Sequence, residues 1–262
     1  MPDQSISVFI ESLLRESGRI SLAEQKRSTV VNKSAKGEIT TNVDRKLGAY
    51  IAEKIYQAFP DDSIVSEEVA TCKQGKGANI WYIDPLDGTT NYVHRLPFFA
   101  ISLGYYEKIG GKPLLSGVYI PYYDQLFMAL ASEDSTLNGK KINVSSSSKL
   151  SSSLILTGMS HKVQKEDKGL GAFIEISKCS AGTRRSGSAA FDLCYVAAGF
   201  ADAYYHYNLR PWDIAAGAHI VKNSGGQITN IEQSYDFDIT KASILGANNQ
   251  LHAELLKTLI SL

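Results

Sequence analysis

Apolar residues near the start of the chain recur at helical spacing. Five of them follow the three-and-four spacing of a single buried face: Ile6, Phe9, Ile10, Leu13 and Leu14. This pattern predicts an amphipathic helix over residues 4–27. A second helix with the same spacing is predicted to follow Asp44 and to end before Pro60, because proline cannot continue a helix.

Shorter apolar runs separated by turn residues predict strands. Ile64-Val65 and the run from Trp81 to Ile83 come first, and a meander of antiparallel strands is predicted at 100–106, 117–120 and 125–130. The pair Asn138-Gly139 is a hairpin signal. The second half alternates strands (154–156, 203–205, 242–246) with helices (165–176, 189–198, 214–222, 252–262). A meander followed by such alternation predicts an α+β or layered α/β fold.

Length and composition set the size of the molecule. A chain of 262 residues with 44% hydrophobic residues can bury a large core as one domain or as two joined lobes. The serine-rich stretch at residues 145–153 is the best candidate for a boundary between lobes. We therefore expect an N-terminal lobe over residues 1–144 and a C-terminal lobe over residues 145–262, packed closely as one unit.

The charge balance and the cysteines narrow the class of protein. Lys plus Arg and Asp plus Glu both number 27, so no overall charge attracts the chain to nucleic acid or to an anionic membrane. Cys72, Cys179 and Cys194 are far apart and form no CxxC pair, which argues against a disulfide framework or a zinc site. Charged residues interrupt the first twenty positions, so we expect no signal peptide, and a reduced cytoplasmic protein fits best.

The candidate chemistry gathers after the Trp81 to Ile83 run. Asp84 and Asp87 follow it, and Asp84-Pro85 predicts a turn just past the strand end. The next residues, Gly-Thr-Thr-Asn, could open a helix, whose free N–H groups suit a phosphate. Two close carboxylates repel unless a cation lies between them. From these residues alone, a divalent metal that bridges carboxylates to a phosphate and an ordinary Asp-Pro turn are both open.

Two further acids lie at the edges of apolar runs. Glu67 follows Ile64-Val65, and Asp213 is predicted on the first turn of a helix. A single Asp there would be explained by helix capping. Together with Asp84 and Asp87, however, they provide the oxygen ligands that Mg²⁺ prefers.

Two long motifs resemble those of a known family. Residues 84–91 read DPLDGTTN and residues 212–217 read WDIAAG, and both closely resemble the signatures of the inositol monophosphatase family. The resemblance covers nearly the whole chain, including Glu67 and the Thr41 to Asp44 segment. It implies a layered α-β-α-β-α sandwich of the inositol monophosphatase and fructose-1,6-bisphosphatase type. It also implies a Mg²⁺-dependent, lithium-sensitive phosphate monoester hydrolase that forms a homodimer.

The resemblance implies a set of metal ligands. Glu67, Asp84 and the Leu86 carbonyl would hold one Mg²⁺, and Asp84, Asp87 and Asp213 a second, with Asp84 shared. A third, weaker Mg²⁺ would lie near Glu67. Two such cations would clamp the attacking and leaving oxygens of an in-line displacement.

The remaining roles are implied in the same way. Gly88 and Thr89 would bind the phosphate through their N–H groups, and Thr89 with Asp44 would orient and help deprotonate the attacking water. We therefore expect Thr89, Asp44 and Glu67 to be catalytic. The residues expected to contact substrate are Asp87, Gly187, Ser188, Ala189, His206, Arg210 and Lys33. Thr41 is expected to be structural, His94 to pack inside, and Lys33 is as readily a solvated loop residue.

One position departs from the family pattern. Inositol monophosphatases keep a Glu seven residues before the Asp of the second motif, where it binds a substrate hydroxyl, and this chain has His206 there. Arg210 lies close by, and Arg184 and Arg185 could add positive charge. The substrate could therefore be an inositol phosphate, fructose-1,6-bisphosphate, or a nucleotide such as 3′-phosphoadenosine 5′-phosphate or NADP. A catalytically inactive binding protein on the same fold is the alternative from another class.

Overall fold

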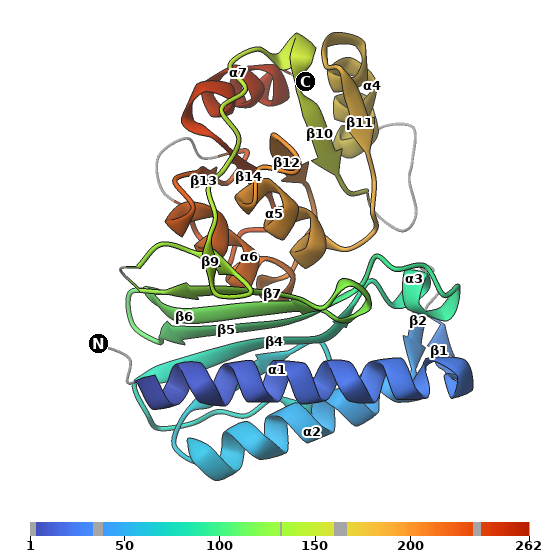
Figure 1. The fold of residues 1–262 in the computed structure, drawn as a ribbon, viewed down its shortest axis with the longest axis vertical. Helices are drawn as coiled ribbons and strands as arrows, with labels where there is room; N and C mark the ends of the chain where they lie inside the picture. Colours follow the sequence, from blue (N-terminus) through green and yellow to red (C-terminus); the bar gives the residue numbers. More distant parts are fainter. Residues whose placement is uncertain (1–3, 34–38, 132, 160–166, 233–236, 262) are drawn as a thin grey trace.

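The computed structural model of the chain describes residues 4–33, 39–131, 133–159, 167–232 and 237–261. Layers of helices and sheets alternate from one end of the molecule to the other (Figure 1). Two helices cover a large sheet, two more helices separate it from a smaller sheet, and a last pair covers the smaller sheet's outer face. This arrangement confirms the layered α-β-α-β-α sandwich.

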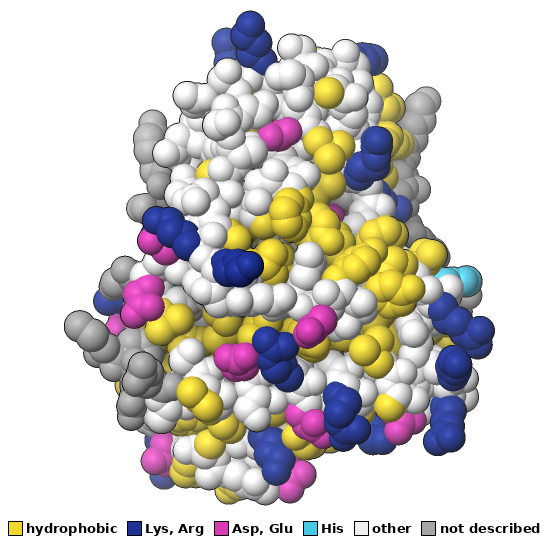
Figure 2. Space-filling view, in the orientation of Figure 1, with side chains coloured by type: hydrophobic (Ala, Val, Ile, Leu, Met, Phe, Trp, Pro, Cys, Tyr) yellow, Lys and Arg dark blue, Asp and Glu magenta, His cyan; other side chains and the backbone are white. Residues whose placement is uncertain are grey.

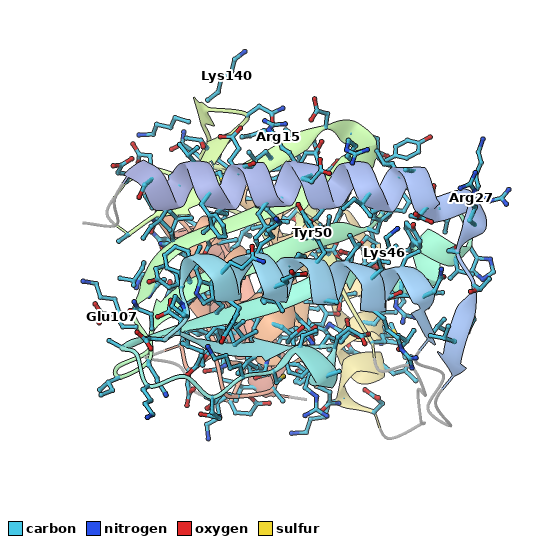
Figure 3. All side chains as sticks on the ribbon, turned by 90° about the horizontal axis from the view of Figure 1, so that it is seen from below. Arg15, Arg27, Lys46, Tyr50, Glu107 and Lys140 are labelled. Atoms are coloured by element: carbon cyan, nitrogen blue, oxygen red, sulfur yellow. The ribbon has the colours of Figure 1, made fainter. Side chains whose placement is uncertain are left out.

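The first layer consists of α1 (Gln4–Glu24) and α2 (Asn42–Ala58). They run side by side beneath the large sheet, with their charged side chains turned to solvent (Figure 3). The predicted apolar stripe of the first helix is buried, because Ile10, Leu13 and Leu14 are at most 4% exposed. The helix is confirmed, although its predicted last turn is a separate 3₁₀ turn at Gln25–Arg27. Between the two helices, β1 (Val30–Lys33) and β2 (Ile39–Thr41) form an antiparallel pair.

The large sheet has seven strands in the order β3-β4-β5-β6-β7-β8-β9. Their bounds are β3 (Ser63–Ser66), β4 (Asn79–Asp87), β5 (Ala100–Glu107), β6 (Pro113–Ile120), β7 (Gln125–Leu130), β8 (Thr136–Leu137) and β9 (Lys140–Lys141). The β3–β4 pair is parallel, and the later pairs are antiparallel. Asn138 (φ 49°) and Gly139 (φ 75°) join the last two strands. The predicted meander and hairpin are therefore confirmed.

The central layer consists of α5 (Ala189–Ala197) and α6 (Pro211–Asn223), which lie between the two sheets. Both are rich in alanine, and the small side chains allow close packing against each other and against β4, β5 and β6. Successive side chains of β4 point to opposite faces of the sheet, so they belong to two different hydrophobic cores. Trp81 and Ile83 face α1 and α2, whereas Tyr82 packs on the side of α5 and α6.

The smaller sheet has five strands in the order β11-β10-β12-β14-β13. Their bounds are β10 (Leu154–Thr157), β11 (Gly182–Arg184), β12 (Ala203–His206), β13 (Gln227–Thr229) and β14 (Ile244–Ala247). Helices α3 (Thr89–Val93), α4 (Lys168–Cys179) and α7 (Asn249–Ile260) complete the element list. The sequence pattern did not predict β11 or β13, which are three residues long and carry no sustained alternation.

The chain passes from the large sheet to the small one through residues 145–153, where Leu150–Ser152 forms a 3₁₀ turn. The lobe boundary in this segment stays a prediction. The predicted start of a helix at Lys165 lies outside the described residues, and α4 ends three residues later than predicted, at Cys179. No helix in the described part of the chain is long and apolar enough to cross a membrane.

Candidate active site

The site begins where β4 ends. The predicted turn after Ile83 is wrong, because the strand continues to Asp87 through a bulge: Asp84 lies opposite Ser102 and Asp87 opposite Ala100. Three steps along β4 therefore match two along β5. The bulge accommodates Pro85, which has no N–H for the ladder, and the Leu86 N–H donates to Asp84 Oδ1 at 3.0 Å. The bulge brings Asp84 and Asp87 to the same end of the strand.

A short helix follows at once, as predicted. Gly88 is the residue before α3 and has φ 95°, a conformation that favours glycine. A Cβ there would lie 2.7 Å from the Phe98 carbonyl oxygen, so space as well as conformation excludes a side chain. Thr89 is the first residue of α3. The backbone N–H groups at this helix start precede the first helical hydrogen bond, which runs from the Tyr92 N–H to the Gly88 carbonyl.

The Thr89 hydroxyl connects this strand end to α2. Its Oγ1 lies 2.7 Å from Asp44 Oδ1 and 3.1 Å from the Leu86 carbonyl oxygen. Asp44 lies inside the first turn of α2, not before the helix as predicted. There it forms a capping box with Thr41, whose N–H and hydroxyl both bond to Asp44 Oδ2. Thr41 is thus structural, and it fixes the carboxylate that accepts from Thr89.

Asp87 is held by the start of α5. Its Oδ2 accepts the Ser188 hydroxyl and the Ala190 N–H, both at 2.7 Å. Ser188 caps the helix, and Gly187 before it has φ 93°. Asn91 fixes the same turn, because its Nδ2 donates to the Ser186 carbonyl at 2.9 Å. Sequence reasoning missed Ala190 and this role of Asn91, although Asn91 ends the first motif.

Asp213 is contributed by another element, α6. It lies on the first turn of α6, as predicted, and its Oδ2 accepts the Arg210 N–H at 2.7 Å. The Arg210 side chain is exposed at the rim. Thus Asp84, Asp87 and Asp213 are each oriented by a backbone N–H from within their own or a neighbouring element.

These carboxylates influence one another electrically. Asp84 is buried, Asp87 and Asp213 are half-buried, and Glu67 keeps one side exposed. Desolvation and then Asp213 raise the pKa of Glu67 to about 8, and desolvation and then Asp87 raise the pKa of Asp213 to about 7. Desolvation, Glu67 and Asp87 raise the pKa of Asp84 well above its usual range. Four acids that repel in this way need a nearby positive charge to ionise together.

In the described part of the chain, no three Asp, Glu, His or Cys side chains converge as a ready-made metal site. The carboxylates surround the space, but several of their oxygens are turned to protein donors: Asp84 Oδ1, Asp87 Oδ2 and Asp213 Oδ2. The donor set is made of oxygen alone, with the Leu86 carbonyl beside it. This chemistry fits a hard divalent cation, which would also relieve the repulsion that raises the pKa values.

His206, which was predicted to contact substrate, lies in the small sheet. His206 ends β12, and its Nδ1 lies 3.0 Å from the hydroxyl of buried Tyr204. Its ring lies against Gly158, where a Cβ would be only 2.3 Å from Nδ1. Exposed Arg185 reaches across the end of β10 and donates to the Met159 carbonyl at 3.3 Å. Tyr204 and Gly158 were missed because nothing in the sequence pattern distinguishes them from ordinary strand residues.

The predictions for His94, Lys33 and Arg184 have different outcomes. His94 was expected to pack inside, but it is exposed at the end of α3, so that prediction is wrong. The side chain of Lys33 lies outside the described residues, and its contact with substrate stays a prediction. Arg184, unlike Arg185, turns back to the carbonyl of Thr183 at 2.8 Å.

Comparisons with known proteins place the chain in a class of phosphoric monoester hydrolases and give its family. A family model described as "Inositol monophosphatase family" matches residues 3–261. The chain belongs to the inositol monophosphatase family and is a phosphatase of that kind.

Individual relatives match over most of their length. An inositol-1-monophosphatase from Synechocystis is 35% identical, and the match covers 97% of this chain and 88% of the relative. The Nus factor SuhB of Escherichia coli is 34% identical, with coverage of 88% and 87%. The solved structure of a Thermotoga maritima IMPase has a TM-score of 0.87 at 33% identity, and the match covers 98% of both chains.

Two further structures hold ligands. A staphylococcal enzyme described as "Inositol monophosphate bound SaIMPase-II" has a TM-score of 0.80 at 28% identity and covers 98% of this chain and 94% of its own. An IMPase/NADP phosphatase in complex with NADP and Ca²⁺ has a TM-score of 0.85 at 26% identity, with coverage of 97% and 94%. Structural neighbours of this chain thus bind phosphorylated substrates, and one of them binds a divalent cation.

Proposed function

We propose that the protein is a Mg²⁺-dependent phosphate monoester hydrolase of the inositol-1-monophosphatase type, in which water attacks phosphorus. The observation that carries the proposal is the Asp44–Thr89 hydrogen bond of 2.7 Å beside Asp84 and Asp87 at one end of β4. A fixed hydroxyl beside oxygen ligands can orient water next to a bound phosphate. The family membership supports the same reaction.

Two or three Mg²⁺ ions fit the proposal. Glu67, Asp84 and the Leu86 carbonyl would hold one, and Asp84, Asp87 and Asp213 a second, with a weaker third near Glu67. Bound Mg²⁺ would supply positive charge that lowers the pKa of water and neutralises the phosphate oxygens. The support is the all-oxygen donor set and the mutual repulsion that raises the pKa of these acids.

Side chains and backbone N–H groups of the protein are proposed to accept the proton from the attacking water and to bind the phosphate. The Thr89 hydroxyl donates to Asp44, so its oxygen lone pairs remain to accept a hydrogen bond from the attacking water. Desolvation raises the pKa of Asp44, which suits it to receive a proton through Thr89. The N–H groups of Gly88 and Thr89 are proposed to bind the phosphate. Glu67 is proposed to act from the far side of the same water.

The organic part of the substrate is proposed to contact residues around the starts of α5 and α6 and the end of β12. Its proposed contacts are Asp87, Gly187, Ser188, Ala189, His206, Arg210 and Lys33. Support comes from the Ser188 bond to Asp87, which puts the 187–189 turn beside the acids, and from the Arg210 N–H bond to Asp213.

A phosphate-release screen tests the function. The panel is inositol-1-phosphate, fructose-1,6-bisphosphate, 2′-AMP, 3′-phosphoadenosine 5′-phosphate and NADP⁺, each with Mg²⁺, with Mg²⁺ plus Li⁺, and with a chelator. We expect release that requires Mg²⁺ and falls with Li⁺. No release from any ester with any divalent cation contradicts the proposal and favours the non-catalytic binding protein. One relative carries the name of a Nus factor, but the Asp44, Thr89 and acid geometry argues for catalysis here.

A bisphosphatase or nucleotide phosphatase is the second candidate. The observations that favour it are the exposed guanidinium of Arg185, which donates to the Met159 carbonyl beyond the end of β10, and the exposed side chain of Arg210 three residues before Asp213. A neighbour in complex with NADP is compatible with it. A preference of at least tenfold in kcat/KM for inositol-1-phosphate over the bisphosphate and the nucleotides would exclude this candidate.

We also propose that the chain pairs as a homodimer in the cytoplasm. Support for pairing is an exposed aromatic face on which Tyr122, Tyr123 and Phe200 are 56%, 42% and 51% exposed, around half-buried Tyr195 (Figure 2). Three unpaired cysteines support a reducing compartment. Sedimentation tests pairing: Phe200→Asp should give a monomer, and Ile109→Asp, at an exposed loop position, should not. Sedimentation of the wild type as a monomer at micromolar concentration contradicts it.

A further inference from the structure

We propose that Asp192 is a positioning residue for the proposed metal site: through Ser186 it fixes the turn at residues 186–188, and that turn orients Asp87. Asp192 thereby sets how tightly the site binds Mg²⁺ without touching the cation. This inference rests on the proposed function and deepens it. It depends on three observations: the bonds from the turn to Asp87, the contacts of Ser186, and the burial of Asp192.

The start of α5 holds Asp87 by direct hydrogen bonds. The Ser188 hydroxyl and the Ala190 N–H both donate to Asp87 Oδ2 at 2.7 Å. Because both bonds go to the same oxygen, the position of this turn sets the direction in which the other oxygen of the carboxylate points. A displaced turn would therefore change the geometry that Asp87 offers to a cation.

Two residues outside the turn interact with Ser186. Asn91, in α3, donates its Nδ2 to the Ser186 carbonyl at 2.9 Å and to the Phe98 carbonyl at 2.6 Å. The hydroxyl and the backbone N–H of Ser186 act as donors to the Asp192 carboxylate. The same hydroxyl accepts the Ser188 N–H at 3.1 Å and lies 3.2 Å from the Ser188 carbonyl, but a carboxylate is the stronger acceptor. Asp192 thus acts on the turn through Ser186.

Asp192 is buried, and burial of an acid is costly unless the acid is paired. Its side chain is 2% exposed on the first turn of α5, and its Oδ1 has no hydrogen-bond partner among the described residues. Burial raises the pKa of Asp192 well above its usual range, Ser186 lowers it in part, and the charge of Asp87 raises it further. Helix capping does not account for this placement, because Ser188 already caps α5. The carboxylate therefore contributes through its interaction with Ser186.

The test measures Mg²⁺ binding and stability separately. One readout is the Mg²⁺ concentration for half-maximal phosphate release, and the other is the Mg²⁺ concentration for half of the rise in Tm, which needs no substrate. We expect Asp192→Ala to raise both concentrations by about 10- to 100-fold, the usual effect of a residue that orients a metal ligand. The value of kcat at saturating Mg²⁺ should be nearly unchanged. Val196→Ala, which shortens a fully buried side chain of the same helix, should lower the metal-free Tm and leave both concentrations unchanged.

Two further variants test the route through Ser186. Ser186→Ala should raise both Mg²⁺ concentrations, and the double variant should raise them no further than Asp192→Ala alone, because both substitutions remove the same hydrogen bond. Asp192→Asn keeps an acceptor oxygen in a side chain of the same size and should recover most of the loss. If Asp192→Ala does not fold, Ser186→Ala tests the same hydrogen bond.

The outcomes separate this inference from the proposed function. The inference is overturned if Asp192→Ala keeps the Mg²⁺ dependence of wild type, if the two alanine substitutions have additive effects, or if Asp192→Asn loses as much as Asp192→Ala. Each of these results leaves the hydrolase in place. If wild type shows a rise in Tm with Mg²⁺ but releases phosphate from no ester in the screen, the proposed function fails, and the melting readout still decides the role of Asp192.

Discussion

Two strand ends, one in each sheet, carry predicted site residues, and they differ in how they are built. The end of β4 carries Asp84 and Asp87, and a bulge and a helix start fix their positions. The end of β12 carries His206, and a tyrosine hydroxyl and a glycine fix its ring. The acidic end needs a nearby positive charge before its groups can ionise together, whereas exposed Arg185, bonded to the Met159 carbonyl, lies near the end of β12. We propose that the first end sets the reaction and that the second contributes to the choice of substrate.

Asp87→Asn tests the role of the acidic end most directly. The substitution removes a proposed ligand charge and leaves the size of the side chain unchanged, so Mg²⁺-dependent kcat should fall by at least about 1,000-fold. Phosphate release at saturating Mg²⁺ measures it. Asp61→Asn, at an exposed turn, should retain full activity. Turnover of Asp87→Asn near that of wild type would remove Asp87 from the mechanism.

Thr89→Val removes the hydroxyl that connects the acidic end to Asp44. Without it no oriented group remains beside the attacking water, and kcat should fall by about 100- to 1,000-fold with a small change in KM. Thr89→Ser, which restores the hydroxyl, should recover most of the loss. The neighbouring Thr90 is exposed, so Thr90→Val is the matched control. Equal kcat in the two valine variants would show that the hydroxyl has no catalytic part.

The acidic end of β4 could be predicted from sequence better than the end of β12, because its residues are close together in the sequence. Asp84, Asp87, Gly88 and Thr89 are consecutive or nearly so, and one strand-to-helix connection positions all of them. The bulge could not be predicted, because a register shift depends on the partner strand β5. At the end of β12, Tyr204 and His206 come from one strand, but Gly158 follows β10 and Arg185 follows β11. Only the parallel pairing of β10 with β12 brings Gly158 beside His206.

A third prediction concerns pH and the metal together. Desolvation raises the pKa of Asp87 to about 6 and of Asp213 to about 7, and it raises the pKa of Asp84 well above its usual range. The metal-free folded state thus binds protons that the unfolded chain has released. The stability that these groups contribute is therefore complete below their ordinary pKa of 3.8 and is lost as pH rises through the raised values. The loss by pH 8 should be about 2–4 kcal/mol, or at least about 5 °C in Tm.

Mg²⁺ favours the ionised carboxylates, so the rise in Tm that it causes should be larger at pH 8 than at pH 5. Melting curves in chelator and in Mg²⁺ across this range measure both effects. Metal-free Asp87→Asn should lose part of the pH dependence, because one of the repelling charges is gone. A metal-free Tm that stays flat or rises between pH 5 and 8 would contradict the electrostatic account of the acidic end.

The smallest expected effect belongs to the contact between the two halves of the chain. The Ser188 hydroxyl, at the start of α5, donates to Asp87 Oδ2 and so orients a carboxylate from the other sheet. Ser188→Ala leaves the Ala190 N–H bond in place. The Mg²⁺ concentration for half-maximal activity should therefore rise only about tenfold, with kcat at saturating Mg²⁺ nearly unchanged. Ser177→Ala, which removes a surface hydroxyl pair with Thr183, is the control. If Ser188→Ala instead lowered kcat at saturating Mg²⁺ and left the Mg²⁺ dependence unchanged, Ser188 would act on the substrate and not through Asp87. The proposed division of roles between the ends of β4 and β12 would then need a third part at the start of α5.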